Sequence, residues 1–342
     1  MPSSTIARYF AIVLVSLASA GALYQLIGAR RSARRYLPPG TLFDVGGHRL
    51  HAVCAGRGMP PVVFESGIAA SSLSWTRVLP EIAAFTHVCA YDRAGLAWSE
   101  MPRRPRTFTQ IVEDLRAVLI HASLRGPYVL VGHSFGCFVV CAYASRYPRE
   151  IAGLVLVDPP AASQWRAPTT REARLLWGGI HFSRLGGLLA RFGVVRACGA
   201  LVVGGAPGAP RAFLKLFGPT ATATIERLVG EIAKLPPEVH PIVQAHWCQP
   251  KCFRAVADHL RVLREAAGFV ASLGSLPDVP LVTISSGTLP PERIEEHRAL
   301  ARLSSNGRHL VAVRSGHWIQ FDEPELIVTA IREVVDQARR PS

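Results

Sequence analysis

The chain has 342 residues, enough for one large α/β domain or two ordinary domains, which excludes a small protein that depends on disulfides or metals to fold. Hydrophobic residues make up 49% of it and charged residues 18%, which excludes a disordered chain and a long coiled coil. The net charge is +14, but nearly all basic residues are Arg scattered among Ala, Gly and Pro, without a helix-turn-helix, RNP or zinc-finger pattern. We therefore expect a packed globular protein that does not bind nucleic acid.

The N-terminal segment is apolar, and residues 9–28 carry no charge. A helix of this length reaches about 30 Å, the thickness of the hydrocarbon core of a bilayer. We expect residues 1–35 to form an uncleaved single-pass anchor with a basic flank, although Ala18-Ser19-Ala20 also suits signal-peptide cleavage. Four Arg follow the segment and one precedes it, which favours a cytoplasmic main domain, whereas a cleaved signal would export the domain.

The seven cysteines are an odd number and do not resemble a disulfide scaffold. Residues 246–259 contain two His and two Cys, but their spacing matches no common zinc pattern, so we expect no metal. A disulfide between Cys248 and Cys252 requires an oxidising compartment. Four cysteines lie in apolar runs and are predicted to be buried thiols, namely Cys54, Cys89, Cys137 and Cys141.

The main domain begins after a linker at residues 36–40. Paired glycines at 46 and 47 predict a β-hairpin, because glycine accepts the positive φ of a tight hairpin turn. Short apolar runs then recur, continuous rather than alternating, which is typical of strands buried on both faces of a parallel sheet. Helix-like segments between most of them predict a mostly parallel, doubly wound α/β sheet. The strand-like runs are 61–66, 87–92, 128–134, 153–158, 280–286 and 309–316, and the helical segments are 107–121, 135–146, 292–303 and 325–338.

The interval 159–276 breaks this alternation and contains many aromatic residues in helix-compatible stretches. We interpret it as a helical lid inserted over the carboxyl edge of the sheet, where ligands bind in such folds. Alternatively, the aromatic residues pack a small core of the insertion itself. The predicted core of the fold is then 36–158 together with 277–342.

The pattern Gly132-His133-Ser134-Phe135-Gly136 follows a predicted strand and precedes a predicted helix. Gly-x-Ser-x-Gly in this context predicts a nucleophile elbow, a sharp turn that lifts the serine hydroxyl off the sheet edge. A serine hydroxyl needs a base to take its proton. We predict His317 as this base, because it follows the last predicted strand and lies C-terminal to the serine.

With these motifs the chain resembles the α/β hydrolases of the serine esterase and lipase branch, from about residue 41 to the C-terminus. The loop at 91–95, Tyr-Asp-Arg-Ala-Gly, is similar to the D-R-x-G loop of that family. We expect Asp92 and Arg93 to form a charged pair that fixes this loop. The resemblance implies an α/β-hydrolase fold with a lid.

The resemblance also implies an oxyanion hole made of backbone amides. In the family, one amide belongs to the residue after the nucleophile, here Phe135. The other comes from the loop after the third strand, where Ile68 or Gly67 is the candidate. A backbone amide can serve whatever the side chain, so the absence of the usual His in this loop does not abolish the hole.

The acid of the triad departs from the family pattern. It most often follows the seventh strand, shortly after a glycine, but Gly287 is followed by no Asp. Asp158, at the end of the sixth strand, is the predicted acid, because some lipases place it there. Glu292 is the alternative, and Asp322 is less favoured. Asp158 could also simply cap the end of its strand.

These residues predict a serine hydrolase that cleaves small or lipophilic carboxylic esters through an acyl-enzyme, without a cofactor. A serine nucleophile argues against an epoxide hydrolase or dehalogenase, which requires an alkyl-carboxylate ester intermediate. A C–C bond hydrolase or aminopeptidase with the same triad stays open, as does a noncatalytic binding or signalling protein that kept the fold. The sequence carries no signal for the oligomeric state.

Overall fold

The computed structural model describes the chain except residues 1–2, 204–211, 213–214, 216–217, 219–229 and 341–342. It divides into two compact units. One comprises Met1–Leu37 and His181–Arg254, and the other comprises Pro38–Ile180 and Ala255–Ser342. The predicted lid, 159–276, is shared between the two units, so its treatment as one lid stays a prediction.

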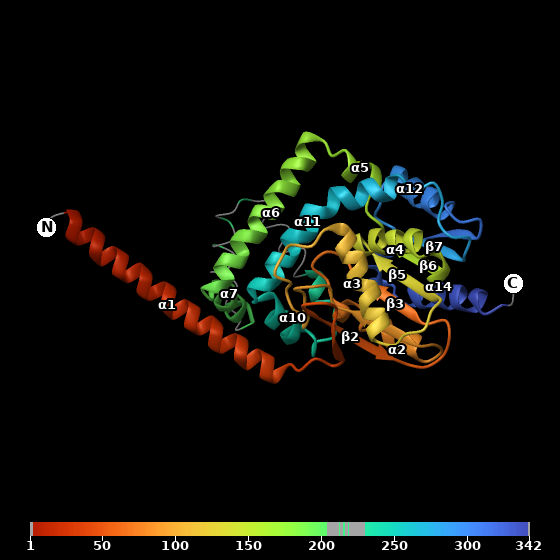
Figure 1. Ribbon diagram of the computed structural model, residues 1–342. Coiled ribbons are helices and arrows are strands. Elements are labelled where there is room, and N and C mark those ends of the chain that lie inside the picture. Colours follow the sequence, from red (N-terminus) through yellow and green to blue (C-terminus); the bar gives the residue numbers. More distant parts are fainter. Residues whose placement is uncertain (1–2, 204–211, 213–214, 216–217, 219–229, 341–342) are drawn as a thin grey trace. The chain divides into compact units, whose positions relative to one another are not determined.

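The larger unit contains an eight-stranded sheet with the strand order β1-β2-β4-β3-β5-β6-β7-β8 (Figure 1). The pairs β1–β2 and β2–β4 are antiparallel, and all other neighbouring pairs are parallel. The predicted hairpin and mostly parallel sheet are thus confirmed. The strands are β1 (Thr41–Asp44), β2 (Arg49–Ala55), β3 (Val62–Glu65), β4 (Val88–Tyr91), β5 (Tyr128–His133), β6 (Ile151–Val157), β7 (Leu281–Ser286) and β8 (Gly307–Ala312).

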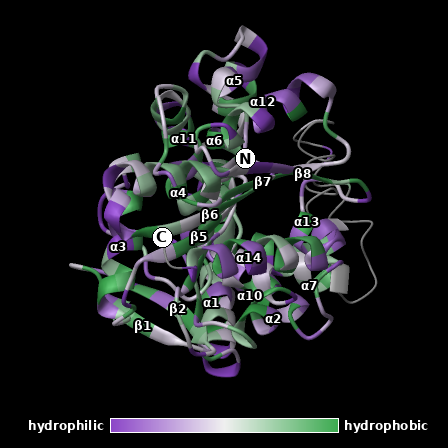
Figure 2. Cartoon of the chain, turned by 90° about the vertical axis from the view of Figure 1, so that its right-hand side faces the viewer, coloured by the Kyte–Doolittle hydropathy of each residue, from purple (hydrophilic) through white to green (hydrophobic). Residues whose placement is uncertain are grey.

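Helices cover both faces of this sheet, which explains the continuous apolar strands. On β5, Leu130 packs into one hydrophobic cluster with α3 and α4, while Val129 and Val131 pack into the other with α2 and α14. Figures 1 and 2 show these helices around the sheet. A capping box opens α3, since the Gln110 amide donates to Thr107 Oγ1 over 3.2 Å. The helices that lie wholly in this unit are α2 (Leu79–Ala83), α3 (Phe108–His121), α4 (Phe135–Arg146), α5 (Ala162–Arg166), α12 (Pro291–Ala301), α13 (Ile319–Asp322) and α14 (Pro324–Ala338), with short 3₁₀ turns at Ser72–Trp75 and Pro148–Glu150.

The smaller unit is helical. It contains α1 (Ser3–Arg35), α7 (Val194–Val203) and α10 (His240–Trp247), together with parts of α6 (Thr170–Arg191) and α11 (Pro250–Ala271). In the described chain α1 is the one helix long and apolar enough to cross a membrane, over Thr5–Arg35. Its second half packs on the rest of this unit, because a Cβ at Gly21 would lie 2.3 Å from the Phe192 carbonyl oxygen and Gln25 Nε2 donates to the Cys248 carbonyl over 2.9 Å.

Two cysteines differ from the prediction. Cys54 and Cys89 form a disulfide, whereas Cys137 and Cys141 are buried free thiols, as expected. The bonded pair are register partners on the antiparallel strands β2 and β4. Directly opposed residues on such strands bring their Cβ atoms close together. The sequence conceals this pairing, because β3 intervenes in the chain between the two strands.

Candidate functional site

A sharp turn joins β5 to α4 and presents Ser134. The backbone of Ser134 has φ 52° and ψ −125°, a conformation that residues with a side chain rarely adopt. Glycine is required on both sides of the serine because other backbone atoms pack closely against these two positions. A Cβ at Gly132 would lie 2.7 Å from the Cys137 amide nitrogen, and one at Gly136 would lie 2.3 Å from the Glu65 carbonyl oxygen. The Gly-x-Ser-x-Gly pattern is therefore a geometric requirement of this turn.

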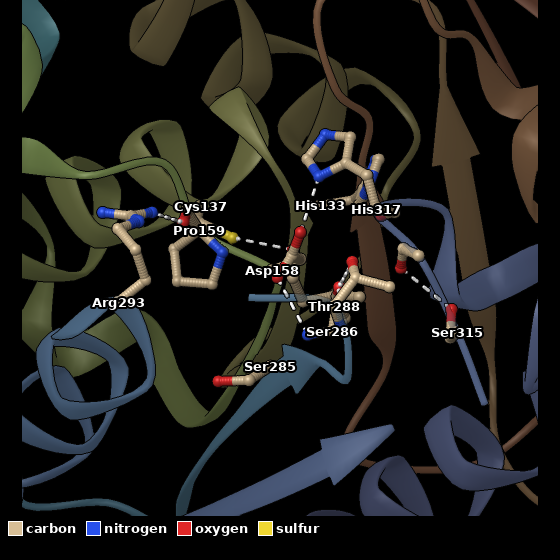
Figure 3. A network of polar contacts seen from close by, with 12 residues as sticks. His133, Cys137, Asp158, Pro159, Ser285, Ser286, Thr288, Arg293, Ser315 and His317 are labelled. Atoms are coloured by element: carbon tan, nitrogen blue, oxygen red, sulfur yellow. Dashed lines mark hydrogen bonds and ion pairs between the residues drawn. The ribbon is translucent and has the colours of Figure 1, made fainter. Parts of the chain in front are cut away.

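Asp158 and His317 meet at the same edge of the sheet (Figure 3). Asp158 directly follows β6, and its Oδ2 lies 2.6 Å from His317 Nδ1. Its other oxygen, Oδ1, accepts the Ser286 amide over 2.9 Å. Since carboxylate oxygens only accept, His317 donates from Nδ1, and its Nε2 is left as the basic nitrogen. Asp158 is buried, whereas the His317 side chain is 46% exposed.

The surroundings of Asp158 favour its ionised form. Burial by itself would raise the pKa of this carboxyl, but the hydrogen bonds from His317 and the Ser286 amide outweigh it and hold the pKa below its usual range. The carboxylate is thus charged at neutral pH and suited to stabilising an imidazolium.

His133 supports the turn that carries His317. Its Nε2 donates to the His317 carbonyl oxygen over 2.9 Å, and its Nδ1 lies 3.3 Å from Gln320 Nε2. Burial lowers the pKa of His133 to about 3, and the nearby His317 adds to this. His133 is therefore neutral, and its ring links the elbow to the turn that carries His317.

Ser134 lies beside this pair because β5 and β6 are neighbours and His133 is in register with Val157. The Ser134 amide donates to the Val157 carbonyl over 2.9 Å, one residue before Asp158. Over the residues that the structure describes, no hydrogen bond joins the Ser134 hydroxyl to His317. Catalytic hydrogen bonds often tighten only when substrate is bound.

Two backbone segments with candidate oxyanion amides adjoin Ser134. Phe135 is the first residue of α4, where amides have no partner within the helix. Gly67 lies against the elbow, since a Cβ there would be 3.3 Å from Ser134 Cβ and 3.0 Å from His133 Nδ1. The structure thus brings the two predicted amide sources, Phe135 and the Gly67-Ile68 loop, to the serine.

The other predicted carboxylates lie elsewhere. Glu292 is exposed in the first turn of α12. Asp322 accepts from the Ser315 hydroxyl and the Gly316 amide, both over 3.3 Å, and so stabilises the turn that precedes His317. Of the three carboxylates considered, Asp158 is the one that contacts the His317 ring.

The expected charged pair of Asp92 and Arg93 is wrong. Asp92 accepts from His51 Nδ1 over 2.8 Å and from the Ser72 amide over 2.7 Å. Arg93 instead forms an ion pair with the buried Glu65 on β3. Glu65 lies beside this segment because it ends β3, the parallel neighbour of β4.

Comparison with known proteins agrees with this architecture. The sequence model of the alpha/beta hydrolase fold matches residues 60–198. The chain therefore has the α/β-hydrolase fold. A solved structure of a thermophilic esterase from Thermogutta terrifontis has the same fold, with a TM-score of 0.61 and 21% identity over 86% of this chain and 95% of that chain.

Among curated proteins, epoxide hydrolase A of Mycobacterium tuberculosis is 25% identical to this chain, over 86% of this chain and 97% of that protein. This chain is 34% identical to efuK of Hormonema carpetanum, described as a probable transporter, over 125 residues that span 34% of this chain. The second match spans only 18% of efuK.

A second set of side chains, which no sequence pattern indicates, holds the backbone directly after Asp158. His297 Nε2 donates to the Pro159 carbonyl over 2.8 Å, directly after Asp158. Because this nitrogen carries the proton, His297 Nδ1 accepts from Ser285 Oγ over 2.8 Å, and Ser285 in turn accepts from His309 Nε2 over 2.7 Å. These residues lie on β7, β8 and α12, too far apart in sequence for any motif to reveal them.

No group of three or more potential metal ligands occurs among the described residues. Of the cysteines named in the segment 246–259, Cys248 and Cys252 are free and buried. A cavity of about 10 Å³, the size of one water molecule, lies between the loop after β4, α3 and α11, and Arg93 and His259 are among the residues that line it.

Proposed function

We propose that the protein is a serine hydrolase that cleaves carboxylic esters. The observation that supports this most directly is the 2.6 Å contact between Asp158 Oδ2 and His317 Nδ1, beside a serine in a strained strand-to-helix turn. The hydrolase neighbours, which include an esterase, agree with the reaction class.

In the proposed reaction, Ser134 Oγ attacks the carbonyl carbon of the ester and His317 Nε2 takes the hydroxyl proton. Asp158 stays ionised and stabilises the imidazolium. The amides of Phe135 and of Ile68 or Gly67 bind the oxyanion of the tetrahedral intermediate. The intermediate collapses to an acyl-enzyme, and the alcohol leaves with the proton from His317. Water, deprotonated by His317, then releases the carboxylic acid.

Epoxide hydrolysis is a weaker candidate, although epoxide hydrolase A is a relative. Ring opening by a carboxylate gives an ester, which water can cleave. Ring opening by Ser134 would give an ether, which the same site could not hydrolyse. The serine therefore favours acyl transfer, and a C–C hydrolase or aminopeptidase with the same triad is the alternative that shares its acyl-enzyme chemistry.

Wild-type protein is expected to react stoichiometrically with a fluorophosphonate probe and to hydrolyse p-nitrophenyl esters. Ser134→Ala is expected to abolish labelling and to lower kcat by about 10⁴-fold to 10⁶-fold, because the nucleophile is lost. Ser272→Ala is the control, since this exposed serine directly follows α11 and its hydroxyl donates to the Phe269 carbonyl. A panel of acyl chain lengths would define the substrate. A folded wild-type protein that neither labels nor hydrolyses any ester would instead support the noncatalytic binding alternative.

We further propose that residues 9–28 anchor the protein in a membrane. The support is the length and apolarity of α1 and the exposure of its first half. Membranes containing the full chain are expected to retain it through alkaline carbonate extraction, and its intact mass is expected to include residues 1–20. Release by carbonate, or a mass that lacks these residues, would argue for a peripheral or cleaved form.

The side of the membrane is a separate matter. The flanking arginines favour the cytoplasmic side, whereas the disulfide of Cys54 and Cys89 favours an oxidising compartment. In the same preparation, denatured protein would expose five free thiols if the disulfide is formed and seven if it is reduced.

A further inference from the structure

One buried guanidinium holds two consecutive backbone carbonyls of the loop that follows β3. Arg93 Nη1 donates to the Ser66 carbonyl and Nη2 donates to the Gly67 carbonyl. Nη1 also donates to Glu65, and Tyr91 donates its hydroxyl to the other oxygen of this carboxylate. Arg93 is 4% exposed and Glu65 is fully buried. The loop is thus held from one side by a charge-paired donor with a fixed fork geometry.

This contact determines where the amides of the loop point. A trans peptide unit carries its carbonyl and its N–H on opposite sides, and the peptide bonds of this loop are trans. The Ser66 carbonyl shares a unit with the Gly67 amide, and the Gly67 carbonyl shares a unit with the Ile68 amide. Because both carbonyls face Arg93, both amides face away from it.

The loop lies directly against the nucleophile, as the 3.3 Å approach of a Cβ at Gly67 to Ser134 Cβ shows. In the described part of the chain, neither the Gly67 amide nor the Ile68 amide donates to a backbone carbonyl. Arg93 also packs over the ring of Phe135, with 5.3 Å from the guanidinium carbon to the ring centroid. The same side chain therefore contacts both segments that carry candidate oxyanion amides.

We propose that Arg93 is a positioning residue that orients the Gly67 and Ile68 amides toward the oxyanion. This inference rests on the proposed ester hydrolysis. Arg93 does not touch the substrate, and Glu65 supplies the negative charge that makes its burial tolerable. A lysine would keep the charge but would not hold two carbonyls in one plane.

Arg93→Lys is the primary test. We expect kcat to fall about 10-fold to 100-fold with KM changed less than threefold, because the amides act on the transition state. Affinity for a trifluoromethyl ketone, which forms an oxyanion on the serine, is expected to fall by the same factor. Affinity for the matching methyl ketone is expected to stay within threefold. Arg116→Lys is the matched control, since Arg116 pairs with Glu150 just before β6 begins, at the opposite end of this strand from Asp158, and it is expected to leave kcat and both ketone affinities unchanged.

If Arg93→Lys does not fold, Arg93→Met combined with Glu65→Gln removes both buried charges together and should fold better. A structure of the wild-type ketone adduct gives an independent measurement, in which the oxyanion is expected about 3 Å from the Gly67 or Ile68 amide nitrogen. A folded Arg93 variant with unchanged kcat and ketone affinity, or an adduct whose oxyanion contacts neither amide, would overturn the inference. A wild-type protein without esterase activity would overturn the proposed function instead.

Discussion

Asp158→Asn is expected to lower kcat by about 10⁴-fold while the protein stays folded. In the native site one carboxylate oxygen accepts the Ser286 amide and the other accepts from His317 Nδ1. The asparagine would keep its carbonyl oxygen on the Ser286 amide and would turn its NH₂ group toward His317. Nδ1 must then accept, so the ring proton moves to Nε2, the nitrogen that should take the serine proton.

Initial rates on a p-nitrophenyl ester, with a melting temperature for each variant, measure this effect. Glu292→Gln makes the same change of charge at the alternative acid and is expected to alter kcat less than twofold, because Glu292 is exposed on α12. Full activity in folded Asp158→Asn, or a large loss in Glu292→Gln, would show that Asp158 is not the acid.

The second large effect concerns stability in acid. His133 is fully buried and its pKa is lowered from 6.5 to about 3, so below pH 6.5 the unfolded chain binds a proton at this position that the folded chain does not. Stability therefore falls as the pH drops from about 6.5 toward 3, by about 1.4 kcal/mol per pH unit from this residue. Burial lowers the pKa of His259 and of His297 as well, and both act in the same direction.

Urea unfolding of the full chain in detergent, repeated between pH 7 and 5, would measure the slope. His133→Gln is expected to be less stable than wild type at pH 7, because the contact with the His317 carbonyl is altered. Its stability should decline less steeply with acid, so the difference between the two proteins narrows by about 1.4 kcal/mol per pH unit. If stability falls equally steeply with acid in both proteins, His133 is not a source of the loss of stability.

Much of the site could be predicted from local sequence, because its residues follow strands of a parallel sheet. Strand ends on one edge of such a sheet come together, so a Gly-x-Ser-x-Gly turn after β5 and an Asp after β6 imply proximity. The structure places Ser134, Asp158 and His317 at that edge. The resemblance also pointed to the loop at Gly67.

The partners that hold these residues could not be predicted, because each depends on register between distant segments. Arg93 faces Glu65 rather than its neighbour Asp92, since β3 and β4 pair side by side. The disulfide of Cys54 and Cys89 likewise depends on the pairing of β2 with β4. The spacing of residues along the chain does not indicate which of these side chains become partners.

The backbone at the sheet edge that carries the candidate site is costly to form. Five non-glycine residues of the described chain have positive φ. Three of them belong to the candidate site: Ala69 in the loop after β3, Ser134 in the elbow, and Asp158, the proposed acid. Each such conformation costs on the order of 1 kcal/mol, which glycine would avoid. The fold thus gives up some free energy of unfolding to hold these groups in place. Random mutagenesis that selects only for heat resistance is expected to replace residues at this edge first.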